Sequence, residues 1–75
     1  MPVNIVAFGQ LAEITGGDLE IEASDTEELM QLLHEKFTAL KAMKYAIAVN
    51  KKIVTKNTSL QNADMVALMP PFSGG

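Results

Sequence analysis

The chain has 75 residues, fewer than the usual ~100–200 per domain, which leaves room for one domain only. With 48% hydrophobic residues, 20% charged residues and a net charge of -3, it has enough apolar surface to fold and too little charge to be disordered. It contains no cysteine, no arginine and one histidine, which excludes a disulfide framework and a thiol nucleophile and argues against nucleic-acid binding.

No apolar run approaches the ~18 residues that a membrane span needs, so the sequence predicts a soluble protein without a membrane partner, compatible with a cytoplasmic location. Charge is uneven along the chain. Residues 1–35 hold eight of the nine acids and no lysine, whereas residues 36–75 hold all six lysines. Ordinary solvated charge is the favoured interpretation, and an acidic face that attracts a basic partner is the alternative.

The first third of the chain predicts two strands. Residues 3–8 are rich in β-branched and aromatic side chains and end at Gly9, as in a buried strand. Residues 11–14 are interpreted as a turn, and Gly16-Gly17 can supply positive φ angles for a hairpin. Residues 19–23 then alternate apolar and acidic side chains, which indicates a strand with one solvated face.

A helix is predicted over about residues 25–37. Ser24 and Glu27 form a capping-box pattern, and Asp25 with Glu28 forms a competing one. Apolar residues then recur at three- and four-residue spacing, namely Leu29, Met30, Leu33, Phe37 and Leu40.

Three more strands are predicted at residues 45–49, 53–54 and 65–69, with turns at residues 50–52 and 57–62. The order ββαβββ, in which a single helix crosses one face of a mixed sheet, is an α+β roll. We therefore expect one domain over residues 1–69 and an extended tail over residues 70–75.

Catalytic patterns are missing from the side chains. The sequence has no glycine-rich phosphate loop and no pair of ligands at metal spacing, so we expect no metal site. His34 beside the apolar stripe is better explained as a surface or boundary residue than as a catalyst. Glu27 and Glu28 are better explained as charges at a helix start than as an acid and base pair.

The most informative segment is the ending Pro70-Pro71-Phe72-Ser73-Gly74-Gly75. Consecutive prolines give a stiff, extended spacer, and Phe72 can anchor in a partner's pocket. Glycines can pass through a channel too narrow for other residues. The reactive group would be the carboxylate of Gly75, which needs activation by ATP before sulfur can displace its oxygen. Since this chain lacks the side chains for that chemistry, it would be the substrate of another enzyme.

This ending resembles the PPxxGG ending of the MoaD/ThiS family of sulfur carriers, in particular the small subunits of molybdopterin synthase. Residues 8–16, 48–50 and 60–68 are also similar to family segments, although Ala63-Asp64 stands where Gly-Asp is usual and Met69 where an aromatic residue is common. The resemblance spans nearly the whole chain.

The resemblance implies a β-grasp, ubiquitin-like fold and a set of partners. An E1-like adenylating enzyme would activate Gly75 with ATP, a persulfide would supply sulfur, and the large subunit of molybdopterin synthase would receive the tail in a heterotetramer. Sulfur would pass to cyclic pyranopterin monophosphate, giving the molybdopterin dithiolene. No cofactor would be bound by the chain itself.

Strand alternation predicts an apolar patch beside the tail. Asn4 marks the solvent side of the first strand, so Phe8 should point away from the helix. If Val66 and Leu68 face the core, Met69 faces outward, and Ile53 would lie near it. We expect Phe8, Ile53 and Met69 to bind a partner, the alternative being unrelated surface hydrophobes.

Three other functions compete with the molybdopterin pathway. A thiamin-pathway sulfur carrier shares the fold and the diglycine, and a ubiquitin-like modifier would join Gly75 to target lysines. The third alternative is a binding module whose tail has no role.

Overall fold

The computed structural model describes residues 2–70 of the chain. These residues form five strands, two α-helices and a 3-10 helix, in the order β1 (Pro2–Ala7), α1 (Gln10–Thr15), β2 (Leu19–Glu22), α2 (Thr26–Lys36), η1 (Thr38–Ala42), β3 (Ala46–Val49), β4 (Lys52–Val54) and β5 (Met65–Met69).

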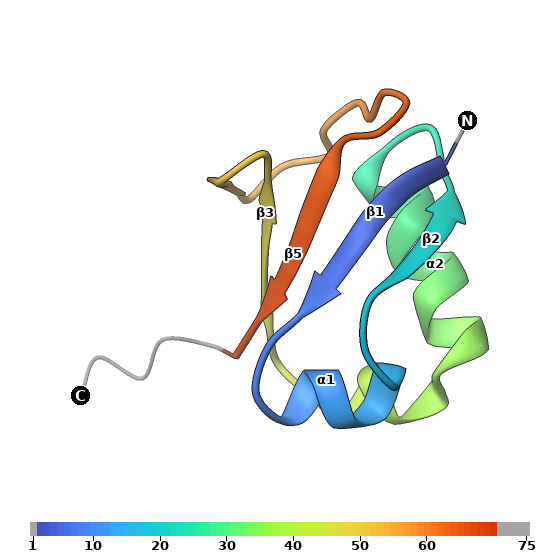
Figure 1. The fold of residues 1–75 in the computed structure, drawn as a ribbon, viewed down its shortest axis with the longest axis vertical. Coiled ribbons are helices and arrows are strands. Elements are labelled where there is room, and N and C mark those ends of the chain that lie inside the picture. Colours follow the sequence, from blue (N-terminus) through green and yellow to red (C-terminus); the bar gives the residue numbers. More distant parts are fainter. Residues whose placement is uncertain (1, 71–75) are drawn as a thin grey trace.

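The strands form one mixed sheet in the order β2-β1-β5-β3-β4. β1 and β5 are parallel at its centre, and every other pair is antiparallel. Helix α2 covers one face of the sheet. β1 and β5 run side by side, and α1 lies at the end of the sheet toward which both strands run (Figure 1). The predicted α+β roll with a mixed sheet is confirmed.

The core lies between this sheet and α2. Alternate residues of the central strands are buried there, with Val3, Val66 and Leu68 fully inaccessible to solvent. Leu29 and Leu33 of α2 are equally buried, because residues four apart lie on the same side of a helix. The strand alternation that the sequence predicts is therefore confirmed in both central strands.

The start of α2 decides between the two predicted caps. The side chain of Asp25 accepts a hydrogen bond from the Glu28 N–H at 2.8 Å, so Asp25 is the N-cap and the Ser24–Glu27 pairing is wrong. Ser24 stays outside the helix because its carbonyl accepts the Leu60 N–H at 2.9 Å, and its own N–H donates to the Glu28 carboxylate at 2.6 Å.

The prediction of a turn at residues 11–14 is also wrong, since these residues belong to α1. Leu11 is fully buried, and Gly9 and Gly16 bracket the helix with positive φ angles of 61° and 80°. Gly17 has a φ of 117°, which confirms the expected positive φ at Gly16-Gly17, although the connection holds a helix in place of a tight hairpin.

Residues 71–75 lie outside the described part of the chain. The tail residues Pro71, Phe72, Ser73, Gly74 and Gly75 therefore remain predictions, as does the division into a domain over residues 1–69 and a tail over residues 70–75.

Candidate functional site

The candidate site is the sheet face opposite α2. Strand pairing places Ala67 between Val6 of β1 and Ala48 of β3, and Ala48 opposite Ile53 of β4. Since neighbouring residues of a strand point to opposite faces, the partners of buried Val66 and Leu68 are on the helix side. We call the remaining set the apolar outer face: Val6, Phe8, Ala46, Ala48, Ile53, Met65, Ala67 and Met69.

Exposure concentrates on this face. Three large hydrophobic side chains of residues 2–70 are exposed, Ile53 by 67%, Phe8 by 48% and Met65 by 43%, and all three belong to the apolar outer face. Single exposed hydrophobes are ordinary on protein surfaces, whereas a contiguous group marks an interaction surface. The concentration on one face favours a partner surface over unrelated surface hydrophobes.

Phe8 and Met69 lie together, as the sequence predicts. Phe8 directly follows β1, and its N–H donates to the Leu68 carbonyl at 3.0 Å, which continues the pairing of β1 with β5. Phe8 is exposed and Met69 is half-buried. Both residues stand at the end of β5 from which the chain continues to Pro70.

Ile53 belongs to the same face but is not adjacent to this pair. It lies in β4, two strands from β5, in the row that also contains Ala48 and Ala67. Of the alanines between Ile53 and the Phe8–Met69 pair, Ala48 is buried and Ala67 is half-buried, so the accessible apolar surface of this face comes from the larger side chains around them.

Met65 is the exposed residue of this face that the patch prediction omits. It has the same strand parity as Ala67 and Met69, so the alternation that assigned Met69 outward also contained the signal for Met65.

Gly9 leaves space for Pro70, the first residue of the predicted tail, which we call the tail root. A Cβ atom at Gly9 would lie 3.1 Å from Cγ of Pro70, so the proline ring packs where a side chain would otherwise stand. The φ of 61° and ψ of -136° at Gly9 add a second reason for glycine, because this region disfavours residues that have a side chain. Glycine at this position thereby leaves room for the Pro70 ring.

A clasp between loops supports the start of β5. The Asn50 side chain donates to the Asp64 carboxylate at 3.0 Å and accepts from the Met65 N–H at 3.0 Å. The Gln61 N–H donates to the other Asp64 oxygen at 2.8 Å. These bonds, first that from Asn50 and then that from Gln61, lower the pKa of Asp64 because they stabilise its charged form. We call this the Asn50–Asp64 clasp.

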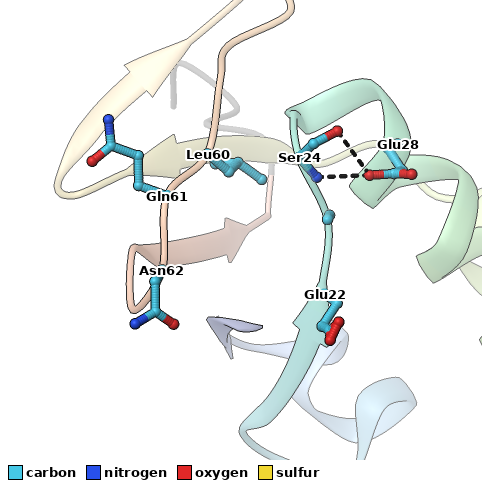
Figure 2. A pocket seen from close by; sticks show the side chains of 7 residues that line it. Glu22, Ser24, Glu28, Leu60, Gln61 and Asn62 are labelled. Atoms are coloured by element: carbon cyan, nitrogen blue, oxygen red, sulfur yellow. Dashed lines mark hydrogen bonds between the residues drawn. The ribbon is translucent and has the colours of Figure 1, made fainter. Parts of the chain in front are cut away.

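A polar hollow between β2, α2 and the loop before β5 is the rival site. Figure 2 shows the Ser24 and Glu28 side chains directed toward each other, whereas Gln61 and Asn62 point away from them. The Ser24 hydroxyl donates to the Glu28 carboxylate at 3.0 Å. Glu28 is thus engaged at the helix start, which agrees with the capping role and not with acid and base chemistry.

His34 takes part in side-chain contacts between α2 and the residue before β3. Its Nε2 lies 2.8 Å from the Tyr45 hydroxyl, which donates to the sulfur of Met30 at 3.2 Å. Burial raises the pKa of Tyr45. His34 is half-buried on α2, on the opposite side of the sheet from the apolar outer face, which agrees with its interpretation as a boundary residue.

Within residues 2–70 no group of three or more histidine, cysteine, aspartate or glutamate residues could hold a metal ion. In the same part of the chain no helix has the length and apolar character needed to cross a membrane.

Comparisons with known proteins agree with this geometry. The chain matches the model of the ThiS family over residues 5–75. The molybdopterin synthase sulfur carrier subunit of Haemophilus influenzae is 29% identical over 80 residues, which cover 97% of this chain and 99% of that protein.

Solved structures extend the likeness to the fold. A chain of the complex of subunits 1 and 2 of molybdopterin-converting factor from Helicobacter pylori is 33% identical, with a TM-score of 0.77 over 100% of both chains. The small archaeal modifier protein 1 of Methanosarcina acetivorans has a TM-score of 0.83 at 22% identity, covering 99% of this chain and 96% of that one, and supports the β-grasp, ubiquitin-like fold alone. Because the family model spans nearly the whole sequence, the chain belongs to the ThiS family.

Proposed function

We propose that the protein is the sulfur-carrier small subunit of a molybdopterin synthase. The observation that carries the proposal is the position of the apolar outer face, which ends in Phe8 and Met69 at the root of the Pro70–Gly75 tail. The names of its relatives, molybdopterin synthase sulfur carrier subunits, support this pathway over the thiamin pathway.

The partner of the apolar outer face is the large subunit of the synthase. The solved complex of subunits 1 and 2 from Helicobacter pylori supports such an assembly for this chain. Exposed Phe8, Ile53 and Met65 supply the apolar contact area. The partner's active site would receive Gly75, and Phe72 would be an anchor in a partner's pocket. Two such pairs would form the heterotetramer.

Activation of Gly75 requires other enzymes. An E1-like enzyme joins the Gly75 carboxylate to AMP from ATP and releases pyrophosphate. The terminal sulfur of a persulfide then displaces AMP, and a thiol cleaves the resulting S–S bond to leave the thiocarboxylate. This proposal rests on the sequence, which has no cysteine for the sulfur step. ATP is consumed by the partner enzyme, and this chain binds no cofactor of its own.

In the synthase, the thiocarboxylate sulfur forms a bond to carbon of cyclic pyranopterin monophosphate, and water then cleaves the acyl–sulfur bond and returns Gly75 to a carboxylate. Two rounds build the dithiolene of molybdopterin. The small subunit contributes the sulfur at Gly75 and no catalytic side chain.

Intact mass spectrometry of the protein purified from its own cells tests the proposal. We expect a species whose mass exceeds that of the unmodified chain by the exchange of one oxygen for sulfur, with the change assigned to Gly75 by fragmentation. A variant that lacks Gly75 is the matched control and should show no such species. A carboxylate at Gly75 in every preparation, including cells induced for molybdoenzymes, would contradict the proposal.

Genetic deletion separates the pathways. The molybdopterin proposal predicts loss of molybdoenzyme activity with growth independent of added thiamin, whereas a thiamin carrier would give thiamin auxotrophy. A modifier would instead give high-mass conjugates on immunoblots that disappear with the Gly75 deletion.

A further inference from the structure

The strand β2 forms one edge of the sheet, on the side where α2 lies (Figure 1). The direction of its backbone groups follows from β1. The Asn4 and Phe8 N–H groups donate to β5 or the residue before it, so even-numbered residues of β1 face β5 and odd-numbered residues face β2. Val3 and Ile5 therefore bond to their partners Ile21 and Leu19.

The same alternation directs the Glu20 N–H and C=O away from β1, toward the free edge. Such an edge is a template for one more strand. The exposed acid at Glu20 is typical of edges that avoid pairing with another copy, because two β2 strands side by side would bring their glutamates together.

A groove runs beside this edge, between β2 and α2. It is lined by Glu20, Ile21, Leu32, Glu35 and Lys36. Ile21 and Leu32 are half-buried and form its apolar part, with the exposed Glu35 beside them on α2. Glu20 has the opposite strand parity to Ile21, so its exposed carboxylate lies on the other face of β2, in the row of Asn4 and Met65. The ammonium of Lys36 lies 6.0 Å from the centre of the Phe37 ring, so an aromatic face attracts this cation.

We propose that this edge and groove bind an extended basic segment of a partner protein by strand addition. The main chain of the segment pairs with Glu20, and its alternate side chains divide between two environments. Apolar side chains on the α2 side pack on Ile21 and Leu32, and lysine or arginine side chains on the opposite side lie beside Glu20. Glu35 adds negative charge at the rim of the groove. This proposal favours the second interpretation of the acidic first half of the sequence, an acidic face that attracts a basic partner, over ordinary solvated charge.

This surface lies apart from Phe8, Ile53 and Met69 of the apolar outer face and adjoins Met65. The groove opens between β2 and α2, whereas the Glu20 side chain lies on the other side of the sheet, in the row of Asn4 and Met65. A partner at β2 therefore leaves Phe8, Met69 and the tail root at Pro70 accessible. The proposal does not depend on the proposed function.

The test uses the full-length 15N-labelled protein and a capped six-residue peptide of alternating lysine and valine. We expect amide chemical shift changes at Glu20, Ile21 and Leu32, and slower hydrogen exchange at the Glu20 N–H on binding. The peptide with glutamate in place of lysine should not bind. A peptide N-methylated on its pairing edge should not bind either, whereas one N-methylated on the opposite edge should.

Charge reversal supplies the matched variants. Glu20→Lys combined with Glu35→Lys should weaken binding of the lysine–valine peptide by about tenfold or more, because both changes replace attraction of the peptide's lysines by repulsion. Glu13→Lys combined with Glu27→Lys makes the same change in net charge at exposed residues outside the groove and should weaken it less than about twofold.

Three results would overturn the proposal: no binding at millimolar peptide, shift changes confined to Phe8, Ile53 and Met69, or equal weakening by both double variants. Size-exclusion chromatography at increasing protein concentration should show a monomer. A dimer abolished by Glu20→Lys would mean that a second copy occupies the edge, and would also overturn it.

Discussion

Ala63 adopts a backbone conformation that favours glycine. Its φ is 69°, in the left-handed region, and it stands where the family usually has glycine. The Ala63 N–H donates to the Pro2 carbonyl at 2.9 Å, so the loop is held in place and the side chain is exposed. The strain is local and independent of core packing.

Ala63→Gly is expected to raise the free energy of unfolding by about 1 kcal/mol, because it removes the left-handed penalty and loses only an exposed methyl group. Urea unfolding measures the change. Ala39→Gly, at an exposed residue of η1 without a positive φ, should destabilise the protein. A loss of stability in Ala63→Gly would show that this residue is not strained.

Asp64 makes the free energy of unfolding depend on pH at acid values. The Asn50–Asp64 clasp lowers the pKa of Asp64 in the folded protein, so the unfolded chain binds the proton more readily. The stabilisation is full above the unfolded pKa of about 4 and is lost as the pH falls through the lower folded pKa.

Asp64→Asn is expected to lower the free energy of unfolding at neutral pH. The difference in free energy of unfolding between the parent protein and this variant should become smaller as the pH falls from about 5 to about 3. Urea unfolding at each pH measures this difference. Asp18→Asn removes the same charge at an exposed residue outside the clasp and is the control. A difference for Asp64→Asn that stays constant over this range would rule out the clasp as its source.

At the scale of elements, the longer patterns were predictable and the short helices were not. The predicted strand at residues 65–69 coincides with β5, and the helix at about residues 25–37 coincides closely with α2. Both patterns rest on several alternating or periodic side chains. Helices α1 and η1 have six and five residues, too few for a period to be distinguished from a turn.

The cap of α2 could not be decided from local sequence either. Ser24 and Asp25 each have a glutamate three residues later. The decision comes from the distant loop before β5, where the Leu60 N–H donates to Ser24 and the Thr58 carbonyl accepts from Thr26. Contacts between residues more than thirty positions apart are invisible to a local pattern.

Gly9 joins β1, α1 and the root of the tail, so its replacement affects all three elements. Gly9→Ala should destabilise the protein by about 1–3 kcal/mol through backbone strain. Its new Cβ would lie 3.1 Å from Cγ of Pro70, so the Pro70 ring should shift. We therefore expect weaker binding of the large subunit, measured by calorimetry at a temperature where the variant is folded.

Gly16→Ala separates the two effects. Gly16 also has a positive φ, but no atom lies within 4 Å of a Cβ built there. This control should lose about 1–2 kcal/mol of stability and keep its partner affinity. If both variants lose affinity equally, Gly9 does not act through Pro70.

For the whole molecule, the two faces of the sheet have different roles: one forms the core, and the other is the proposed partner surface. One face is buried under α2, and the other carries the exposed hydrophobic side chains, of which Phe8 lies next to the tail root. Parity along a strand revealed that Phe8 and Met69 face outward. It could not place Ile53 two strands away, because the strand order β1-β5-β3-β4 is set by tertiary packing.

Phe8→Asp tests this division. Phe8 is 48% exposed and outside the core, so the variant should keep its free energy of unfolding within about 1 kcal/mol. Burial of an aromatic side chain at an interface contributes about 1.5–3 kcal/mol, so the Kd for the large subunit should rise about 10–100-fold in calorimetry. Gln31→Glu adds the same charge at an exposed residue of α2 and should leave the Kd unchanged. An unchanged Kd for Phe8→Asp would place the partner elsewhere than the apolar outer face.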